Sequence, residues 1–481
     1  MSVLPSPSNT TGPQSKGYEA NLDDLLLRFA VGPGRQLNIN TAPLQAQAIQ
    51  TSETPEDFQQ EFGQIYSRTD FSGGSGLDKA HKRDAGESAF TRFWDSKGVD
   101  VFSGKEVGQE YKVSLLKSTE ELSSSTNTNL YMEEMSGSIF FADSDVLKRI
   151  DTPTATSITV VSETAPSAGN AITGLAVLGT QLYIVANGVI YKRTSASTYA
   201  THNSTKTFSK IWSMKGRIVA SDTSGDLYQV TSSSNPTTMK TLPTGTEWTD
   251  LADGGAVVLG AASDGYIYSF TDESSSLTLK GQTFIEGEVP NAIDAAQGLI
   301  FYGTYQNTAS GKIGRLYRAE ITNANSLYVL VNAQLIKQWG DGTTTIDQAP
   351  YKIISTRDSI YTGIKDSASV TNLWRYYLPT TGIARDLEFA EGGIVEGMAV
   401  FSDRIFATIS GGGLYREATT FVSSGYIITA LADFFTSEKK QFVGAKLNTN
   451  HVSSGTIKLS TSTIASDITD SNASTWQEQV S

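Results

Sequence analysis

The stretch that decides the fold reads Leu182-Tyr183-Ile184-Val185-Ala186-Asn187-Gly188-Val189-Ile190-Tyr191-Lys192-Arg193. A short apolar run is followed by Asn-Gly and then by a second run that contains an aromatic residue. Asn187-Gly188 suits a two-residue turn, because a positive φ is easy for Gly and tolerable for Asn. The stretch therefore predicts a β-hairpin.

The same pattern recurs between residues 130 and 416 as an apolar strand, a tight turn, and a β-branched or Leu residue beside an aromatic one. One reference position per copy gives residues 147, 191, 228, 268, 317, 374 and 415, at intervals of 44, 37, 40, 49, 57 and 41. A four-stranded propeller blade spans about 40–50 residues. The repeats predict an all-β protein with a β-propeller of about seven blades, six or eight being the tolerance.

Further strands complete the predicted ring. A short apolar strand precedes most copies, for example at residues 172–177 and 394–400, and is predicted to be the innermost strand of its blade. The recurring aromatic residue is predicted to wedge between adjacent blades. Residues 110–117 alternate polar and apolar side chains just before the first copy. We expect this segment to close the ring by joining the last blade, because closure removes two open sheet edges.

Composition shifts divide the chain into three parts. Residues 1–99 are predicted to form an extended arm, rich in Ser, Thr, Gln and Pro up to residue 55. One short helix is predicted within the arm, starting at Thr54-Pro55. Residues 100–420 are predicted to form the propeller. Residues 421–481 contain strand-like segments and predict a small β-sandwich, either minimal or completed by a neighbour. The predicted strands of this module are residues 425–429, 440–447 and 456–460.

Composition also excludes several functional classes. The 481 residues include 50 acids and 37 bases, a net charge of −13, and no cysteine. Nucleic acid is not an expected partner, because phosphate binding needs clustered Lys and Arg. Disulfides, thiol nucleophiles and iron–sulfur clusters are excluded. Membrane insertion is not expected, since the apolar stretches are far shorter than the ~20 residues of a membrane helix. The N-terminus shows no secretory signal pattern.

No catalytic, cofactor or metal site is predicted. The histidines His81, His202 and His451 stand in no nucleophile-elbow context, and none of them form a pair at metal-ligand spacing. The cluster Gly73-Gly74-Ser75-Gly76 lacks the Gly-Lys-Ser/Thr ending of a phosphate loop, so a tightly packed or flexible arm is the preferred interpretation.

Two further patterns have a structural and a functional interpretation. Residues 143–145 and 222–226 carry acidic side chains at the alternating spacing of a calcium loop, but they lack its downstream Glu. Turn chemistry alone accounts for Asp, Ser and Gly at these hairpin positions. Four tryptophans are candidates either for a ligand face or for the core. They are Trp212, Trp248, Trp339 and Trp374.

Residues 66–78 (Tyr-Ser-Arg-Thr-Asp-Phe-Ser-Gly-Gly-Ser-Gly-Leu-Asp) and 91–102 (Thr-Arg-Phe-Trp-Asp-Ser-Lys-Gly-Val-Asp-Val-Phe) resemble the N-terminal region of tailed-bacteriophage minor tail proteins. The order of arm, Gly-Gly-x-Gly segment, propeller and sandwich is also similar. The resemblance implies a non-enzymatic virion component near the tail tip or baseplate, assembled in the host cytoplasm. This chain departs from the pattern by ending early in the sandwich.

The sequence thus predicts a structural virion protein that docks on neighbouring tail or baseplate proteins and follows the tail symmetry as a homo-oligomer. It is expected to offer a host-facing surface for a glycan or protein. The predicted assembly residues of the arm are Phe71, Phe90, Phe93 and Trp94. Deleting residues 1–99 is expected to leave a folded propeller that fails to join particles.

Two alternatives remain open at this point. One is a cell-surface or secreted glycan-binding propeller. The other is a propeller glycosidase or lyase, which would need convergent carboxylates.

Overall fold

The Asn187-Gly188 hairpin shows how each blade is built. In the computed structural model of the chain, β16 (Gln181–Ala186) pairs with β17 (Val189–Ser195) across a turn in which Asn187 has φ 52° and Gly188 has φ 73°. Two positive φ values in a two-residue loop give the turn whose twist matches the flanking strands. The predicted hairpin is therefore confirmed.

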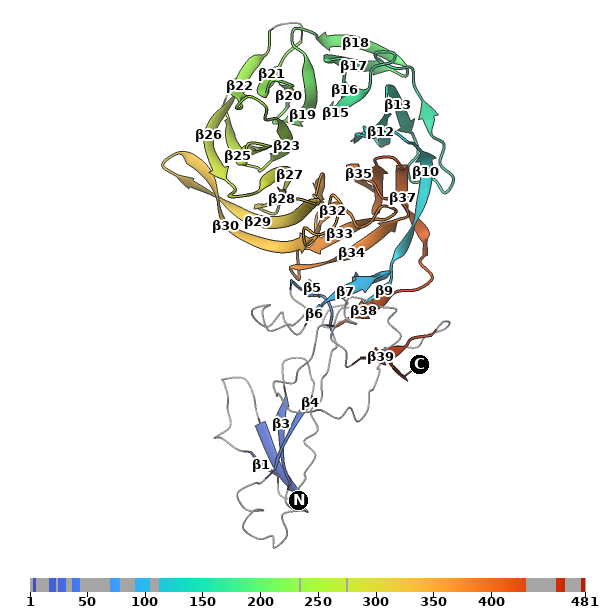
Figure 1. Ribbon diagram of the computed structural model, residues 1–481, viewed down its shortest axis with the longest axis vertical. Coiled ribbons are helices and arrows are strands. Elements are labelled where there is room, and N and C mark those ends of the chain that lie inside the picture. Colours follow the sequence, from blue (N-terminus) through green and yellow to red (C-terminus); the bar gives the residue numbers. More distant parts are fainter. Residues whose placement is uncertain are drawn as a thin grey trace. The chain divides into compact units, whose positions relative to one another are not determined.

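The structure describes residues 70–77, 91–103, 112–232, 235–273, 276–429 and 456–462, together with the backbone of five strands nearer the two ends of the chain. All elements assigned within these residues are β-strands. Seven sheets of the described chain form a ring, so the predicted all-β propeller is confirmed (Figure 1). Six of these sheets have four strands each, and one has six.

The first three blades follow one another along the chain. Blade 1 consists of β11 (Met132–Met135), β12 (Ser138–Asp143), β13 (Val146–Ile150) and β14 (Val161–Ser162). Blade 2 consists of β15 (Ile172–Leu178), β16, β17 and β18 (Thr198–Asn203). Blade 3 consists of β19 (Phe208–Met214), β20 (Arg217–Asp222), β21 (Asp226–Val230) and β22 (Thr237–Thr241).

The next three blades repeat this order. Blade 4 consists of β23 (Trp248–Asp253), β24 (Val257–Ala262), β25 (Tyr266–Asp272) and β26 (Leu277–Phe284). Blade 5 consists of β27 (Val289–Ala296), β28 (Leu299–Asn307), β29 (Lys312–Ala324) and β30 (Leu327–Trp339). Blade 6 is built on β31 (Ile353–Ser355), β32 (Ser359–Lys365), β33 (Thr371–Tyr377) and β34 (Gly382–Phe389).

Blade 7 closes the ring with strands from two distant parts of the chain. It consists of β35 (Val395–Phe401), β36 (Arg404–Ile409), β37 (Gly413–Phe421) and β10 (Lys117–Ser124). The seven reference positions of the sequence repeat all fall on the third strand of a blade. The predicted innermost strands near residues 172 and 394 correspond to β15 and β35, which border the centre of the ring (Figure 1).

The hydrophobic core consists of seven layers, each between two adjacent blades. Tyr228 of blade 3, for example, packs with Ala176 and Tyr183 of blade 2, and Tyr268 of blade 4 packs with Val219 of blade 3. The other five clusters join the remaining neighbouring pairs in the same way. Because the recurring aromatic residues lie in these layers, the predicted wedge role is confirmed.

The prediction of the closing strand was wrong by a few residues. Strand β9 (Lys112–Leu115) pairs with β8 (Val99–Ser103), outside the blades. The strand that closes the ring is β10, which runs antiparallel to β37 from Lys117↔Phe421 to Ser124↔Gly413. As predicted, a strand from before the first blade joins the last blade, but β10 is too polar to show the apolar alternation by which strands are recognised in a sequence. Its side chains are half-buried or exposed along the whole strand, as expected for an outermost strand.

Arg416 reinforces this closure. Its guanidinium is almost completely buried; it pairs with Glu120 of β10 at 2.8 Å and donates to the carbonyl oxygens of Ala155 and Thr156 in blade 1, both at 2.8 Å. One side chain therefore links the closing strand, blade 7 and blade 1.

We predict that Arg416→Leu lowers the free energy of unfolding by about 2–4 kcal/mol, because Glu120 loses its ion pair and the carbonyl groups of Ala155 and Thr156 lose the buried donor that joins them to blade 7. Chemical denaturation followed by tryptophan fluorescence measures the change. Arg357→Leu, at an exposed loop position, is the control and should leave the midpoint unchanged. Equal midpoints for the two variants would show that Arg416 does not stabilise the closure.

The flanking regions contain further strands. Four of them form an antiparallel sheet in the order β1 (Val3–Pro5), β2 (Gly17–Leu22), β3 (Leu25–Val31) and β4 (Leu37–Pro43). The extended arm predicted for residues 1–99 stays a prediction. The predicted helix at Thr54-Pro55 and the predicted strand at residues 440–447 lie outside the described residues. Near the C-terminus, β39 (Leu459–Thr461) pairs with β40 (Gln477–Val480).

Candidate functional site: the N-terminal seam and the central channel

The segments that carry the sequence resemblance pack against the outer edge of blade 6. Strand β5 (Gly74–Ser75) pairs in parallel with β34, where Ile383 lies opposite Gly74. Strand β6 (Arg92–Phe93) pairs in parallel with β5, which makes blade 6 a six-stranded sheet. We call the junction between the described residues of 70–103 and blade 6 the N-terminal seam.

The glycine cluster of the seam serves close backbone packing. Gly74 has φ +74°, and a Cβ atom on it would lie 2.4 Å from the backbone nitrogen of Ile383. A Cβ atom on Gly382, in the opposite strand, would lie 2.2 Å from the carbonyl oxygen of Ser72. Only glycine permits such contacts. The packed-arm interpretation of residues 73–76 therefore fits the structure.

Three of the four predicted assembly residues lie at the seam. Phe93 is fully buried in a cluster with Val101 and Ala384, and the half-buried Phe71 meets its ring edge-on at a centroid distance of 6.4 Å. The backbone nitrogen of the half-buried Trp94 donates to the carbonyl of Ile428. Phe90 lies outside the described residues. A role in docking to another protein stays a prediction, and Phe93 has no surface to offer such a partner.

Lys337 of blade 5 anchors the glycine segment, a role that sequence analysis missed. Its ammonium group donates to Ser75 Oγ at 2.6 Å and to the carbonyl oxygen of Gly76 at 3.0 Å. It also lies 5.9 Å from the ring centroid of Trp94 and 5.5 Å from that of Trp374. A cation between two indole rings is held by their negative faces. No local pattern reveals this role, because its partners are distant in sequence.

Arg375 is a second link that sequence analysis missed. Its side chain forms ion pairs with Asp100 of β8 and, at 3.4 Å, with Asp386 of β34. Its guanidinium also lies 5.0 Å from the ring centroid of Phe102. Burial raises the pKa of Asp386, while the charge of Arg375 opposes this effect. The β8 segment is thus fixed to blade 6 by charge as well as by apolar packing.

The segments that precede and follow the propeller meet at the same seam. Strand β7 (Asp95–Lys97) pairs antiparallel with β38 (Tyr426–Ile428), with Ser96 opposite Ile427. The predicted strand at residues 425–429 is therefore confirmed, but its partner is an N-terminal strand. The chain thus enters and leaves the ring at adjacent places.

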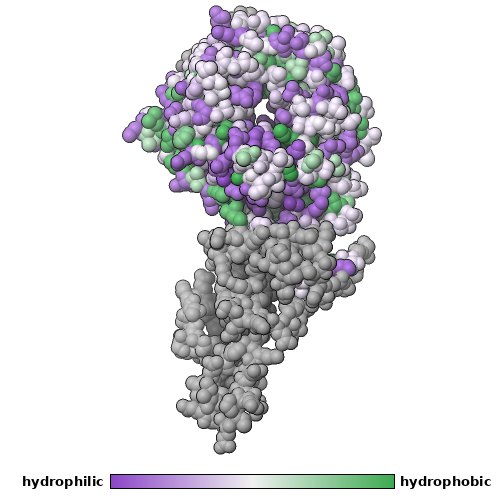
Figure 2. All heavy atoms as spheres, viewed as in Figure 1, coloured by the Kyte–Doolittle hydropathy of each residue, from purple (hydrophilic) through white to green (hydrophobic). Residues whose placement is uncertain are grey.

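A second cluster of polar groups lies at the middle of the ring, where a hollow is visible in the space-filling view (Figure 2). Lys352, before β31, lies 3.9 Å from Asp250 of β23, which also accepts a hydrogen bond from Trp212 at 3.2 Å. The charge of Lys352 also acts on Glu133 of blade 1. Glu133 lies on β11 and Lys352 directly precedes β31; each of these is the innermost strand of its blade, so both groups belong to the central channel. The charged groups of this channel are Glu133, Lys210, Asp250, Asp294, Lys352 and Glu396.

Two channel carboxyls titrate near neutral pH. Burial raises the pKa of Glu133 to about 7, against the opposing charge of Lys352, and burial raises the pKa of Glu396 to about 7, against that of Lys210. Each group binds more protons in the folded than in the unfolded chain between its ordinary pKa and about 7. Protonation in that window therefore favours folding.

We predict that the propeller becomes less stable as the pH rises from about 6 to 8, because both carboxyls then ionise in a partly desolvated channel. Thermal unfolding at several pH values measures this slope. Glu133→Gln should flatten it, whereas the exposed control Glu286→Gln should keep it. A melting temperature independent of pH across this range in the unaltered protein would contradict the raised pKa values.

In the acidic turns considered as calcium sites, the carboxylate oxygens accept hydrogen bonds from other groups of the same chain. Asp222 accepts hydrogen bonds from the backbone nitrogens of Ser224 and Asp226 at 2.9 Å, and its other oxygen accepts from the Tyr228 hydroxyl at 2.9 Å. Asp143 accepts from Asn127 at 2.6 Å and pairs with Lys148. Among the described residues, no group of three or more metal-ligating side chains converges. Turn chemistry explains these positions.

The remaining candidates are divided between core and surface. Trp248, Trp339 and Trp374 are core residues, whereas Trp212 is half-buried at the channel. His202 lines a cavity between blades 2 and 3, and His81 and His451 lie outside the described residues. In the described part of the chain, no helix is long and apolar enough to span a bilayer.

Comparisons with known proteins concern the fold alone. No protein-family model matches the sequence, and no curated protein matches it. Similar solved structures include a chain of the mitotic checkpoint complex, with 11% identity, 63% of this chain and 95% of that chain covered, and a TM-score of 0.46. The WD40 repeats of RRP9 are 11% identical; the match covers 63% of this chain and 98% of that one, with a TM-score of 0.45. YCF48 bound to D1 peptide is 11% identical; the match covers 63% of this chain and 96% of that one, with a TM-score of 0.43. The assignment of the propeller rests on the seven sheets described above.

Proposed function

We propose that this chain is a non-enzymatic structural protein of a tailed-bacteriophage virion, located at the tail tip or baseplate and assembled in the host cytoplasm. One observation carries the proposal. The two segments that resemble minor tail proteins form the seam that fixes the N-terminal chain to blade 6. In this role the propeller is a rigid disc, and the chain on either side of it connects the disc to neighbouring tail proteins in a symmetric assembly.

An exposed apolar strip next to the seam supports a docking role. Val113 and Leu115 lie two residues apart on β9, so both side chains point to the same face. Phe421 pairs with Lys117, two residues beyond Leu115, and its side chain is 57% exposed. Large apolar side chains grouped at the surface commonly mark sites of protein contact. We call Val113, Leu115 and Phe421 the apolar strip.

Particle composition tests the proposal directly. An antibody against the recombinant chain should label the tail tip of phage particles purified from the source of the sequence, and mass spectrometry should find the chain in them. Its absence from purified particles would refute the virion role. Binding of the purified monomer to a host or cell-surface polysaccharide, without any presence in particles, would instead favour the glycan-binding alternative.

A matched pair of substitutions tests the apolar strip. Phe421→Ser should reduce incorporation into particles, because it removes apolar surface from the strip. Phe284→Ser is the control, since Phe284 is equally exposed, at 56% against 57%, but belongs to blade 4. Both variants should keep the melting temperature of the unaltered chain. Equal incorporation of the two variants would exclude the strip as the docking surface.

A further inference from the structure

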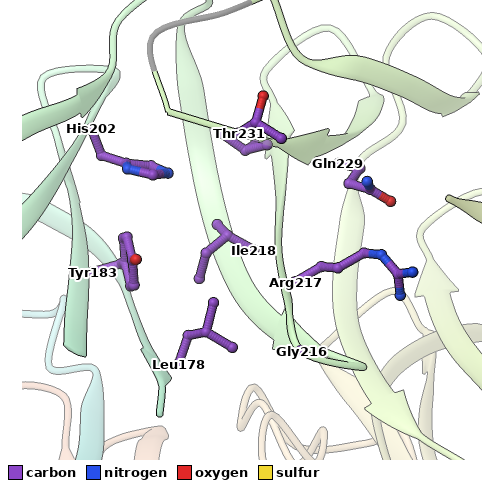
Figure 3. A pocket seen from close by; sticks show the side chains of 9 residues that line it. Leu178, Tyr183, His202, Gly216, Arg217, Ile218, Gln229 and Thr231 are labelled. Carbon is purple, nitrogen blue, oxygen red and sulfur yellow. The ribbon is translucent and has the colours of Figure 1, made fainter. Parts of the chain in front are cut away.

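A cavity of about 170 Å³ lies between blades 2 and 3 (Figure 3). Leu178 and Ile218 supply aliphatic surface, Tyr183 and His202 form an aromatic wall, and Thr231 lies at the upper end in this view. Apolar walls with a few polar groups are typical of small-ligand sites.

The aromatic wall carries polar groups that the fold leaves unused. Tyr183 is 7% exposed and His202 is half-buried; the hydrogen bonds found among the described residues involve neither the Tyr183 hydroxyl nor the His202 imidazole, and neither group belongs to the buried side-chain atoms that lack a partner. The two rings meet edge-on, with centroids 4.9 Å apart and an interplanar angle of 73°. Both groups are reachable from solvent, so a polar ligand in the cavity can form hydrogen bonds with them.

The charge around the cavity is unusual for this acidic protein. Residues 164–221 contain no Asp or Glu and six basic residues. The basic residues are Lys192, Arg193, Lys206, Lys210, Lys215 and Arg217. Four of them form ion pairs with acids from elsewhere in the chain, including Arg217 with Asp272 at 2.6 Å. In Figure 3 the side chain of Arg217 points away from His202 and Tyr183.

Lys192 is the cation that acts on the cavity. Lys192 lies opposite Tyr183 in the pairing of β16 with β17, so the two side chains stand on the same face of blade 2. Burial, and secondly the positive charge of Lys192, lower the pKa of His202. No ion pair of Lys192 is found within the described residues. A Lys charge without an acidic partner favours a ligand that brings its own carboxylate.

We propose that this cavity binds a sugar residue that carries a carboxylate, such as a uronic acid. The ring packs on Tyr183 and Ile218, its hydroxyls exchange hydrogen bonds with the Tyr183 hydroxyl and the His202 imidazole, and its carboxylate faces Lys192. An acidic peptide side chain would satisfy Lys192 but leave the hydroxyl and the imidazole without partners. This inference is independent of the proposed virion role, because it concerns only the cavity between blades 2 and 3.

Saturation-transfer NMR on the full chain tests the proposal with two matched probes, methyl β-glucuronoside and methyl β-glucoside. The acidic glycoside should bind about tenfold more tightly than the neutral one, as expected for one charge-assisted hydrogen bond. Lys192→Met should abolish this preference and leave weak binding of both probes. Leu178→Trp, which fills the cavity, should abolish binding of both. Lys240→Met, on another part of blade 3, is the control and should behave like the unaltered chain.

Three results would overturn the assignment. The first is that neither glycoside receives saturation from the protein. The second is that Lys192→Met and Lys240→Met show the same preference for the acidic probe. The third is that an acidic peptide such as acetyl-Asp-Glu-amide displaces the glucuronoside and binds more tightly. Detection in phage particles is a separate measurement, so failure of the sugar site and failure of the virion role are distinguishable.

Discussion

A chain that lacks residues 1–69 is expected to form a ring as stable as that of the full chain, whereas a chain that lacks residues 1–99 is expected to be severely destabilised. The contacts of the structure separate Met1–Thr69 from the unit that contains the propeller, but residues 70–99 belong to that unit. The longer deletion removes β5 and β6 from blade 6 together with the fully buried Phe93. The loss of one buried Phe side chain alone costs about 3–5 kcal/mol.

This expectation differs from the one drawn from the sequence, which was that deletion of residues 1–99 leaves a folded propeller. Thermal unfolding and limited proteolysis of both truncated chains distinguish the two expectations. Phe93→Ala in the full chain is the point-substitution counterpart and should lose stability without any loss of backbone. If the chain lacking residues 1–99 melts at the temperature of the full chain, the seam does not stabilise blade 6.

The shorter deletion also separates folding from assembly. Under the proposed virion role, a chain lacking residues 1–69 should fold but be absent from particles, because the N-terminal connection to other tail proteins is missing. Incorporation at the normal level would show that residues 1–69 do not form the tether. The apolar strip would then be the remaining candidate for docking.

Replacement of Glu163 by Ala is expected to be among the most destabilising single substitutions in the ring. Its carboxylate is 1% exposed and accepts hydrogen bonds from Arg193 at 2.6 and 2.9 Å, from Arg149 at 3.2 Å, from the Ser197 backbone nitrogen and from the Tyr199 hydroxyl, both at 3.1 Å. Arg149 belongs to blade 1, and the other donors belong to blade 2. Without Glu163, the partly buried guanidinium group of Arg193 loses its counter-charge and Arg149 keeps only its ion pair with Asp151, which costs about 3–5 kcal/mol.

The pH dependence of this interaction has the opposite sign to that of the channel carboxyls. Burial by itself acts to raise the pKa of Glu163, but the hydrogen bonds from Arg193 and Ser197 outweigh it and hold the pKa below its usual value. The stabilisation is therefore complete above the ordinary pKa of Glu and is lost as the pH falls through the lowered value.

Denaturant unfolding of Glu163→Ala at pH 7 and at pH 3 measures both effects. The difference from the unaltered protein should be large at pH 7 and should be smaller at pH 3, because below the ordinary pKa of Glu the unfolded chain takes up a proton more readily than the folded chain does. Glu286→Ala, at an exposed position, is the control and should change little at either pH. A cost for Glu163→Ala that is the same at both pH values would indicate lost packing and no contribution from the ion pairs.

The propeller was predictable from sequence because its signal is local and repeated. Each hairpin joins strands that are adjacent in the chain, so the spacing of residues such as Tyr228 and Tyr268 reports the blade period directly. The sequence offers two adjacent segments as candidates for the closing strand. Residues 110–117 have the apolar alternation, but the more polar β10 pairs with β37, because an outermost strand needs little apolar surface.

The seam and the cavity could not be predicted in the same way, because their partners come from distant parts of the chain. Phe93 packs against Ala384, and Lys337 donates to Ser75. Neither pair leaves a local pattern. The cavity at Tyr183 and His202 is completed by Ile218 of the next blade. Only the absence of acids from residues 164–221 was visible in the sequence as a sign of that site.

The pairing of β7 with β38 has a mechanical consequence. A pulling force applied to the chain on both sides of the propeller would load the ladder of Asp95, Ser96 and Lys97 with Ile428, Ile427 and Tyr426, together with strands β5 and β6 at the edge of blade 6. Tension would therefore pass through the seam and the edge of blade 6, and the other six blades would lie outside its path. The disc could keep its shape while the segments beside it bear the load.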